Sequence, residues 1–223
     1  MNYLIEPTCQ ITGLDEIYLK YLGYKTDGVF IEVGAFDGQT HSNTCTLADL
    51  GWEGLYVEPV EEYAELCKKR HQSNNVKVEN TIIGDQEGWV RLAVAGELST
   101  VIDNPQGMYK QAGLEGLYEL ENKNKTIDIY QFTLNQILFD NDVEPGFDLL
   151  VIDTESTEYK VLKGFDIDKY KPKMVIIEMH ETSQEWNSIQ SVKEENKNIN
   201  DYFSNAHYLK VFSDGINTIF VRL

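Results

Sequence analysis

The chain has 223 residues, of which 42% are hydrophobic, and its 37 acidic and 19 basic side chains give a formal net charge of −18. A chain of this length and apolar content can bury the core of one globular domain. Its basic residues are scattered, which excludes the basic patch on which nucleic-acid binding usually depends.

The apolar segments and the cysteines exclude further classes of protein. No apolar run approaches the roughly 20 residues that a membrane span needs, and the first residues do not resemble a signal peptide. Three cysteines without paired ligand spacing indicate reduced thiols. We therefore expect one cytoplasmic domain over residues 1–223, with an N-terminal helical extension over residues 1–27 and with neither nucleic acid nor membrane as a partner.

The first predicted elements lead into a glycine-rich turn. Acids in its first turn favour a helix over Leu14–Leu22, and the β-branched and aromatic run Val29–Val33 predicts a buried strand. The turn that follows, Gly34–Gly38, can bend sharply and approach a ligand closely. Glu32 and Asp37 would repel phosphate, but they suit an amine, a sulfonium or ribose hydroxyls. This combination indicates a site for S-adenosylmethionine.

A second predicted strand supports that site. Leu55–Glu58 ends on an acid about 20 residues after the turn, where Glu58 can accept hydrogen bonds from ribose hydroxyls. Pro59 ends the strand because it has no N–H group. Two helices are predicted around this strand, over Ser42–Leu50 and Glu61–His71. The turn lacks the G-x-G-x-x-G pattern of dinucleotide sites, and no Walker lysine follows it.

The rest of the chain alternates strands with amphipathic stretches. Further strands are predicted at Val76–Ile83, Trp89–Ala95, Thr126–Phe132, Phe147–Ile152, Met174–Glu178, Tyr208–Phe212 and Thr218–Arg222. Helices are predicted at Leu134–Phe139 and from about Thr157 to Gly164. Residues 104–125 predict a loop with a short helix, which is either a lid or acceptor-binding insertion or a surface excursion. The pattern indicates an α/β fold with a mainly parallel sheet and a final antiparallel hairpin.

Four segments carry a resemblance to a known family: FIEVGAFDGQTHSNT, GLYVEPVEEY, TIIGD and FDLLVIDTESTEYKVLKGFDIDKYKPKMVIIEMH. They resemble the FkbM-type methyltransferases of the class I S-adenosylmethionine-dependent superfamily. The family pattern I-D-x-E-G-x-E-x-x-V-L-x-G matches residues 152–164, except that Ser156 stands where the family usually has glycine. If that position has a positive φ, serine there is strained by roughly 1 kcal/mol or more.

The resemblance covers most of the chain from about Gly28 onward. It implies a Rossmann-like class I fold, in which a mainly parallel seven-stranded sheet has helices on both faces and ends in an antiparallel hairpin. It also implies an S-adenosylmethionine-dependent methyltransferase that acts on sugars, glycan-linked residues or polyketide-like products.

Acids follow several predicted strands, at the sheet edge where α/β proteins bind ligands. They are Glu32, Glu58, Asp85, Asp153 and Glu178. Acids also cap strands and begin turns, but five at one edge would repel one another without a ligand. The resemblance adds Asn43 and Ser99 as cofactor contacts. The full set expected to bind the cofactor is Glu32, Gly34, Asp37, Gly38, Asn43, Glu58, Pro59, Gly84, Asp85, Ser99 and Asp153.

The catalytic candidates follow the fourth and fifth core strands. Methyl transfer to a hydroxyl requires that the acceptor is positioned and loses its proton, so a base or a metal is needed. Asp153, Glu155 and His180 are the candidate catalytic residues, with His180 as a direct general base. Alternatively, Asp153, Glu178 and His180 bind Mg²⁺. His180 can also be a structural histidine bonded to backbone, and His41 is interpreted as structural.

The leading interpretation is an S-adenosylmethionine-dependent O-methyltransferase that acts on a hydroxyl of a sugar, a glycan or a related small molecule. One alternative is a small-molecule N-methyltransferase, because a negatively charged cleft would attract a cationic acceptor. Another is a catalytically silent scaffold that binds the cofactor, which Ser156 favours.

Overall fold

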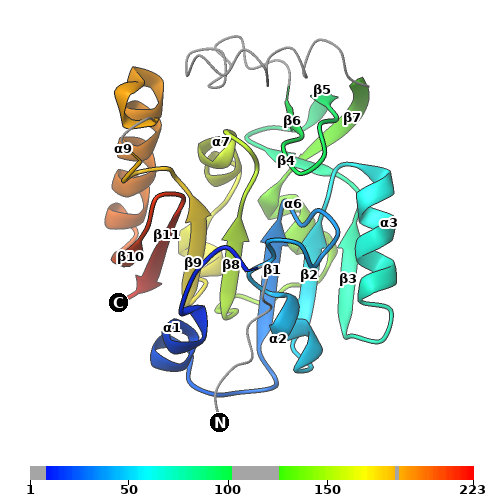
Figure 1. The fold of residues 1–223 in the computed structure, drawn as a ribbon, viewed down its shortest axis with the longest axis horizontal. Helices are drawn as coiled ribbons and strands as arrows, with labels where there is room; N and C mark the ends of the chain where they lie inside the picture. The colour runs from blue at the N-terminus through cyan, green and yellow to red at the C-terminus, as the bar shows by residue number, and fades with distance from the viewer. Residues whose placement is uncertain (1–8, 102–125, 184–185) are drawn as a thin grey trace.

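A computed structural model describes residues 9–101, 126–183 and 186–223. The predicted insertion over residues 104–125 and the first eight residues of the N-terminal extension lie outside these ranges. The described chain forms one large and one small β-sheet, with helices on both faces of the large sheet (Figure 1).

The large sheet contains seven strands in the order β10-β11-β9-β8-β1-β2-β3. Their bounds are β1 Val29–Val33, β2 Glu53–Val57, β3 Val76–Glu79, β8 Leu149–Ile152, β9 Met174–Glu178, β10 Tyr208–Ser213 and β11 Asn217–Arg222. Strands β3, β2, β1, β8 and β9 are parallel. Strand β11 lies antiparallel between β9 and β10. This confirms the predicted mainly parallel sheet that ends in an antiparallel hairpin.

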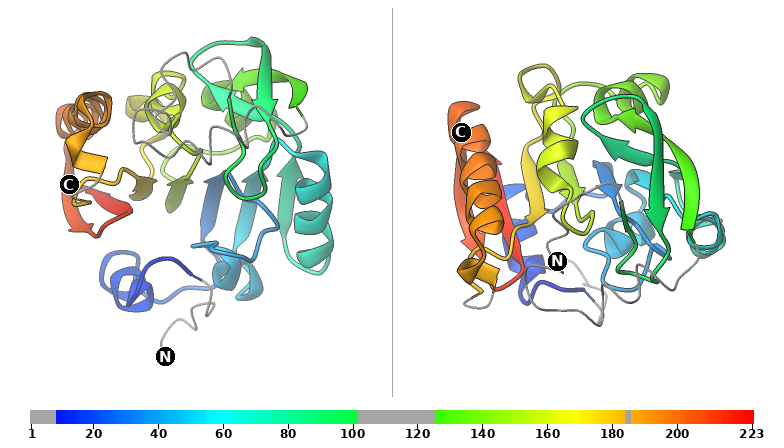
Figure 2. Two further views of the ribbon diagram at one scale, coloured as in Figure 1. Left: turned by 45° about the horizontal axis from the view of Figure 1, so that its top comes forward. Right: turned by 90° about the horizontal axis from the view of Figure 1, so that it is seen from above.

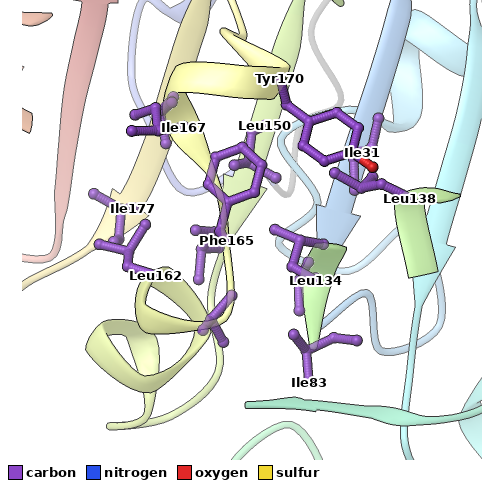
Figure 3. Packing of buried hydrophobic residues seen from close by; sticks show 14 of the residues in the cluster. Ile31, Ile83, Leu134, Leu138, Leu150, Leu162, Phe165, Ile167, Tyr170 and Ile177 are labelled. Carbon is purple, nitrogen blue, oxygen red and sulfur yellow. The ribbon is translucent and has the colours of Figure 1, made fainter. Parts of the chain in front are cut away.

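Both faces of the large sheet are buried by helices, as its unbroken apolar strands require. The helices are α1 Leu14–Tyr21, α2 Cys45–Asp49, α3 Glu61–Arg70, α6 Leu134–Asp140, α7 Glu158–Lys163, α8 Ile167–Tyr170 and α9 Gln190–Asn205. Alternate residues of β8 point to opposite faces. Leu150 packs on the side of α6, α7 and α8 (Figure 3), in a cluster that also includes residues of α9. Leu149 instead packs among residues of α1 and α2. Figure 2 shows these two helical layers from other directions.

The small sheet has the strand order β4-β7-β5-β6. Its strands are β4 Ile82–Gly84, β5 Gly88–Ala93, β6 Thr100–Val101 and β7 Thr126–Thr133. The single strand predicted over Val76–Ile83 is therefore wrong, because the chain passes from β3 in the large sheet to β4 in the small one. Asn80 stands at the break, where its side-chain amide donates to the backbone carbonyls of Glu58 and Pro59. Figure 1 shows the small sheet beyond one end of the large sheet.

Three helices differ from the sequence prediction, and one of them is the short helix α8, which was not predicted. Helix α2 begins at Cys45 and not at Ser42, because the Ser42 hydroxyl accepts from the backbone N–H of Cys45, at 3.0 Å. Helix α9 was not predicted, although its 16 residues make it the longest helix in the described ranges. Its sequence is rich in polar residues, and only four of its side chains are buried. Within those ranges, no helix is long and apolar enough to cross a membrane.

Candidate active site

A cavity of about 310 Å³ lies at the carboxyl ends of β1, β2, β8 and β9. This is the edge at which open α/β sheets bind ligands, and the volume is within the range of small-molecule sites. The small sheet and the segment before β6 contribute another wall, through residues such as Ile82, Leu92 and Thr100. The predicted site residues that line the cavity are Glu32, Gly34, Glu58, Pro59, Ser99, Asp153, Glu155, Glu178 and His180.

The turn after β1 approaches β2 and β8 very closely. The N–H groups of Gly34 and Ala35 both donate to the Val57 carbonyl, at 3.0 and 3.1 Å. Gly34 has φ +89°, and a Cβ there would lie 1.6 Å from the carbonyl oxygen of Asp153. Only glycine fits this conformation and this space. The glycine predicted from the sequence therefore allows three strand ends to meet at the floor of the site.

Glu58 lies at the end of β2 and lines the cavity. Its two carboxylate oxygens accept from the backbone N–H groups of Phe36, at 2.9 Å, and Val60, at 2.8 Å. Burial raises the pKa of Glu58 to about 7, although these hydrogen bonds favour the ionised form. The carboxylate is thus fixed in position beside the glycine turn, and a carboxylate oxygen can accept a second hydrogen bond from a ribose hydroxyl.

Glu32 also lines the cavity but is bonded to the segment before α2. Its carboxylate accepts from the Ser42 hydroxyl at 2.9 Å and from the Thr44 hydroxyl. Burial is the main cause that raises the pKa of Glu32 to about 7. Glu32 therefore ties the segment that precedes helix α2 to the end of β1. The carboxyl group of Glu32 gains or loses its proton near neutral pH.

Five predicted cofactor residues lie outside the described lining of the cavity. They are Asp37, Gly38, Asn43, Gly84 and Asp85. Asp37 accepts from the backbone N–H groups of Gln39 and Thr40, and these bonds hold its pKa below the usual value although burial opposes them. Asp85 pairs with Lys163 at 2.7 Å, which lowers the pKa of Asp85. These two acids stabilise local structure, and they do not reach the cavity.

The glycines and the asparagine of that set have packing partners elsewhere. A Cβ at Gly38 would lie 2.6 Å from the Cys67 sulfur, and one at Gly84 would lie 2.3 Å from the Gln131 side chain. The buried Asn43 side chain accepts from the Cys9 thiol at 3.3 Å. Adjacency in sequence to a site residue does not fix the direction of a side chain, which explains these differences.

Asp153 and Glu178 form a buried pair at the ends of β8 and β9. Their carboxyl groups are hydrogen-bonded to each other, so one of them must carry a proton. Burial raises the pKa of both groups, and for Glu178 the charge of Asp153 adds to the effect. The Gln10 amide donates to Asp153 at 3.4 Å. The pair therefore holds a proton at a higher pH than ordinary exposed carboxyl groups do.

His180 extends this pair. Its Nε2 lies 3.1 Å from a Glu178 carboxyl oxygen, and a hydrogen bond links its ring to the backbone of Gly215. Burial lowers the pKa of His180, so the ring is neutral at pH 7. Trp186 stacks on it with ring centroids 4.7 Å apart. The imidazole is thus held by protein groups on several sides while it lines the cavity.

The group of residues close enough to bind a metal ion differs from the predicted group of Asp153, Glu178 and His180. Among the described residues, the carboxylates of Asp153, Glu155 and Glu178 lie within 4.8 Å of one another, and His180 does not belong to this group. Mg²⁺ needs ionised oxygen ligands, whereas the hydrogen bond between Asp153 and Glu178 needs a proton between them. As they stand, these residues fit a proton-sharing pair better than a magnesium site.

Backbone strain gathers around the cavity. Four lining residues other than glycine have positive φ: Phe36, His41, Glu155 and His180. Ser156, which stands where the family usually has glycine, has φ +79°. A serine with this positive φ is strained, whereas glycine would not be. Its buried hydroxyl has no hydrogen-bond partner in the described ranges. Such conformations persist where surrounding contacts enforce them, and they are common in functional sites.

Several lining residues were missed by the sequence analysis. Gln10 comes from the segment before α1, Glu97 from the segment before β6, and Trp186 from the 3-10 helix η1 (Trp186–Ser188). His41, which was interpreted as structural, also lines the cavity and lies 3.4 Å from Glu97. None of these follows a core strand, so no local pattern marks them.

The strand order and the acid-bearing turn at the end of β1 define the Rossmann-like fold of class I methyltransferases. A Staphylococcus aureus protein assigned as a caffeoyl-CoA O-methyltransferase has this fold, with 13% identity and a TM-score of 0.53 over 97% of this chain and 86% of that one. A precorrin-6y C5,15-methyltransferase from Geobacter metallireducens is more distant in structure, with 10% identity and a TM-score of 0.47 over 97% and 90% of the two chains. At such identities the likeness shows the fold alone.

The chain belongs to the FkbM methyltransferase family, because the family described as "Methyltransferase FkbM domain" matches residues 32–210. No curated protein sequence matches the chain. The family and the fold establish an S-adenosylmethionine-dependent methyltransferase.

Proposed function

We propose that this protein transfers a methyl group from S-adenosylmethionine to a hydroxyl group of a sugar, a glycan or a related small molecule. The observation that carries the proposal is the close pair of carboxyl groups of Asp153 and Glu178 in the cavity wall, whose pKa values are both raised by burial. A hydroxyl is a very weak acid, so its methylation needs a group that removes the proton as the oxygen reacts.

The cofactor would be held at the glycine turn. When bound, S-adenosylmethionine supplies a methyl group on a positively charged sulfur, which the acids of the cavity attract. Glu58 would accept from the ribose hydroxyls, because its carboxylate is fixed beside the turn. Gly34, Pro59 and Ser99 line the same cavity and would shape the cofactor pocket.

Asp153 is the group placed to receive the acceptor's proton. Asp153, Glu178 and His180 all line the cavity, and the Glu178 carboxyl group lies between the other two, bonded to Asp153 and 3.1 Å from the His180 Nε2. As the acceptor oxygen is methylated, its proton would pass to this pair, and the cofactor would supply the methyl group and keep the bonding electrons on its sulfur. Glu155 lines the cavity beside Asp153 and can orient the acceptor through a hydrogen bond.

The nature of the described lining supports a polyol acceptor. Trp186 offers an aromatic surface for an apolar face of a sugar ring. Gln10, Glu97 and Glu155 offer hydrogen-bond acceptors for hydroxyl groups. The net charge of the chain and its free thiols support a cytoplasmic enzyme with a small acceptor and not a nucleic acid.

A second candidate, N-methylation of a small amine, is favoured by the charge of the cavity. Its described lining contains six acids and neither lysine nor arginine; the acids are Glu32, Glu58, Glu97, Asp153, Glu155 and Glu178. This wall would attract an ammonium group. A third candidate is a silent scaffold that binds the cofactor, and it draws support from the strained Ser156 beside the site.

Calorimetric titration with S-adenosylmethionine and S-adenosylhomocysteine, on the wild type and on Glu58→Ala, tests the cofactor site. Binding that weakens at least tenfold in the variant supports it, since a lost charged hydrogen bond costs about 1.5–3 kcal/mol. Methyl-labelled cofactor with panels of free sugars, glycans and amines then tests the acceptor class. Transfer to amines alone would refute O-methylation, and cofactor binding without any transfer would favour the scaffold.

Magnesium dependence is decided in the same assay. Turnover that is unchanged by EDTA would support proton removal by the carboxyl pair. Turnover that is abolished by EDTA and restored by Mg²⁺ would instead assign Asp153, Glu155 and Glu178 to a cation.

A further inference from the structure

A second, smaller cavity lies behind the active-site carboxyl groups, between the end of β9, α7 and α9. Its volume is about 10 Å³, which is room for a single water molecule. Its lining residues are Glu158, Glu178, Met179, His180, Val192, Glu195, Asn196 and Ile199. Glu178 and His180 line both this cavity and the large one, so the wall between the two cavities consists partly of these side chains.

Asn196 marks this cavity as a site for a ligand. Its residue is only 6% exposed, and its side-chain N–H₂ group has no hydrogen-bond partner in the described part of the chain. A buried donor without a partner costs about 1–3 kcal/mol, and most such groups in proteins have a protein or water partner. The unpaired donor and the neighbouring carboxyl oxygens together provide the partners that one water molecule needs.

A cation fits this cavity less well than water. The free atom of Asn196 is a donor, which repels a positive charge. Among the described residues, the group of acids close enough to share an ion is Asp153, Glu155 and Glu178, and it does not include Glu158 or Glu195. The site therefore suits a molecule that both donates and accepts hydrogen bonds.

The carboxyl groups on the far side of the cavity lead toward the surface. Glu158, on α7, is 4% exposed and accepts from the backbone N–H of Thr154 at 2.8 Å. Glu195, on α9, is partly exposed, and it accepts from the backbone N–H of Tyr159 at 3.4 Å. Glu195 is thus the member of this series that reaches solvent.

Both groups hold a proton at a higher pH than an exposed glutamate does. Burial, followed by the charge of Glu195, raises the pKa of Glu158 to about 8. Burial also raises the pKa of Glu195, against the hydrogen bond from Tyr159 and the nearby charges of Lys160 and Lys163.

We infer that a water molecule bound to Asn196 in this cavity conducts the proton released by methyl transfer from the Asp153–Glu178 pair to Glu195, and from there to solvent. This inference rests on the proposed function, because it is the methylated acceptor that releases the proton. The acceptor's oxygen–hydrogen bond breaks, its proton joins the carboxyl pair, and one proton leaves through Glu195 in each turnover. This exit lies apart from the large cavity, in which cofactor and acceptor would both be bound during the reaction.

A crystal structure of the wild-type complex with S-adenosylhomocysteine tests the water site without any acceptor. We expect a water molecule within about 3.2 Å of Asn196 Nδ2 and of a carboxyl oxygen of Glu158, Glu178 or Glu195. An empty cavity, or an Asn196 amide bonded to a protein group, would overturn the inference whether or not the protein methylates hydroxyls.

Kinetics test the route itself. With an acceptor identified by the screen, Glu195→Gln is expected to lower kcat roughly tenfold or more at pH 7 and to leave the KM for S-adenosylmethionine unchanged. Added formate, a small proton carrier, should restore part of the loss, which it would not do for a merely structural defect. The matched control is Glu194→Gln, since Glu194 neighbours Glu195 on α9 but is exposed and bonded to Gln190. Equal kcat values in the two variants would overturn the route, whereas a wild type without turnover on any acceptor would refute the proposed function instead.

Discussion

Replacement of Gly34 by alanine is the perturbation whose effect the structure defines most sharply. Gly34 has φ +89°, and a Cβ would lie 1.6 Å from the carbonyl oxygen of Asp153. The left-handed conformation costs a residue with a side chain about 1–2 kcal/mol. The contact must also push apart the ends of β1 and β8, and such overpacking costs a further 1–3 kcal/mol or so. We therefore expect Gly34→Ala to lower the free energy of unfolding by about 2–5 kcal/mol.

The matched control is Gly146→Ala. Gly146 has a similar φ of +85°, but nothing lies within 4 Å of a Cβ there. Its substitution should cost only the conformational strain, about 1–2 kcal/mol. Both alanines reduce the entropy of the unfolded chain equally, so that effect cancels in the comparison.

Urea unfolding followed by circular dichroism measures both variants, and an unchanged m-value would show that the same surface unfolds. S-adenosylhomocysteine should bind more weakly to Gly34→Ala, because the turn borders the cavity, and with wild-type affinity to Gly146→Ala. If the two variants lose the same stability, the close approach of the turn to β8 is refuted.

Three other predictions concern the site. Ser156→Gly should raise the free energy of unfolding by about 1 kcal/mol, since it removes a positive-φ strain and an unpaired buried hydroxyl; a lower urea midpoint would contradict this. The pKa of Glu32 rises on folding from 4.5 to about 7, so its stabilising contribution is complete below pH 4.5 and is lost as pH rises to 7. The decline in thermal midpoint from pH 5 to pH 8 should therefore be smaller in Glu32→Gln, and equal declines would exclude the raised pKa. Asp85→Asn should leave the affinity for S-adenosylmethionine within about twofold by calorimetry, because Asp85 pairs with Lys163 outside the cavity; a tenfold loss would place Asp85 at the cofactor.

The carboxyl edge of the large sheet could be predicted from the sequence. β1 was predicted with its exact bounds, and the turn at Gly34 and the acid at Glu58 were placed at the ends of β1 and β2. These features are encoded locally, because an apolar run followed by glycine or an acid marks where a buried strand meets solvent. The final hairpin was predicted for the same reason, since a turn-rich segment separates its two strands.

The directions and partners of the side chains were decided only by the tertiary structure. Asp37, Asp85 and Asp153 are all aspartates, but their partners differ. Asp37 accepts a hydrogen bond from the backbone of the turn that follows it, and Asp85 pairs with Lys163. The break between β3 and β4 depends on Asn80 and on carbonyls that lie about 20 residues earlier in the chain.

The active site likewise combines features that the sequence encodes locally with contacts between residues that are far apart in the chain. The sequence by itself determined the fold family, the parallel sheet and the glycine turn with its acids, because each depends on residues that are close together in the chain. The tertiary structure alone decided that Gln10 and Trp186 join the cavity, that the carboxyl groups of Asp153 and Glu178 lie close together, and that α9 brings Asn196 and Glu195 behind them. Those contacts depend on how packed elements meet in space, which no local pattern of residues encodes.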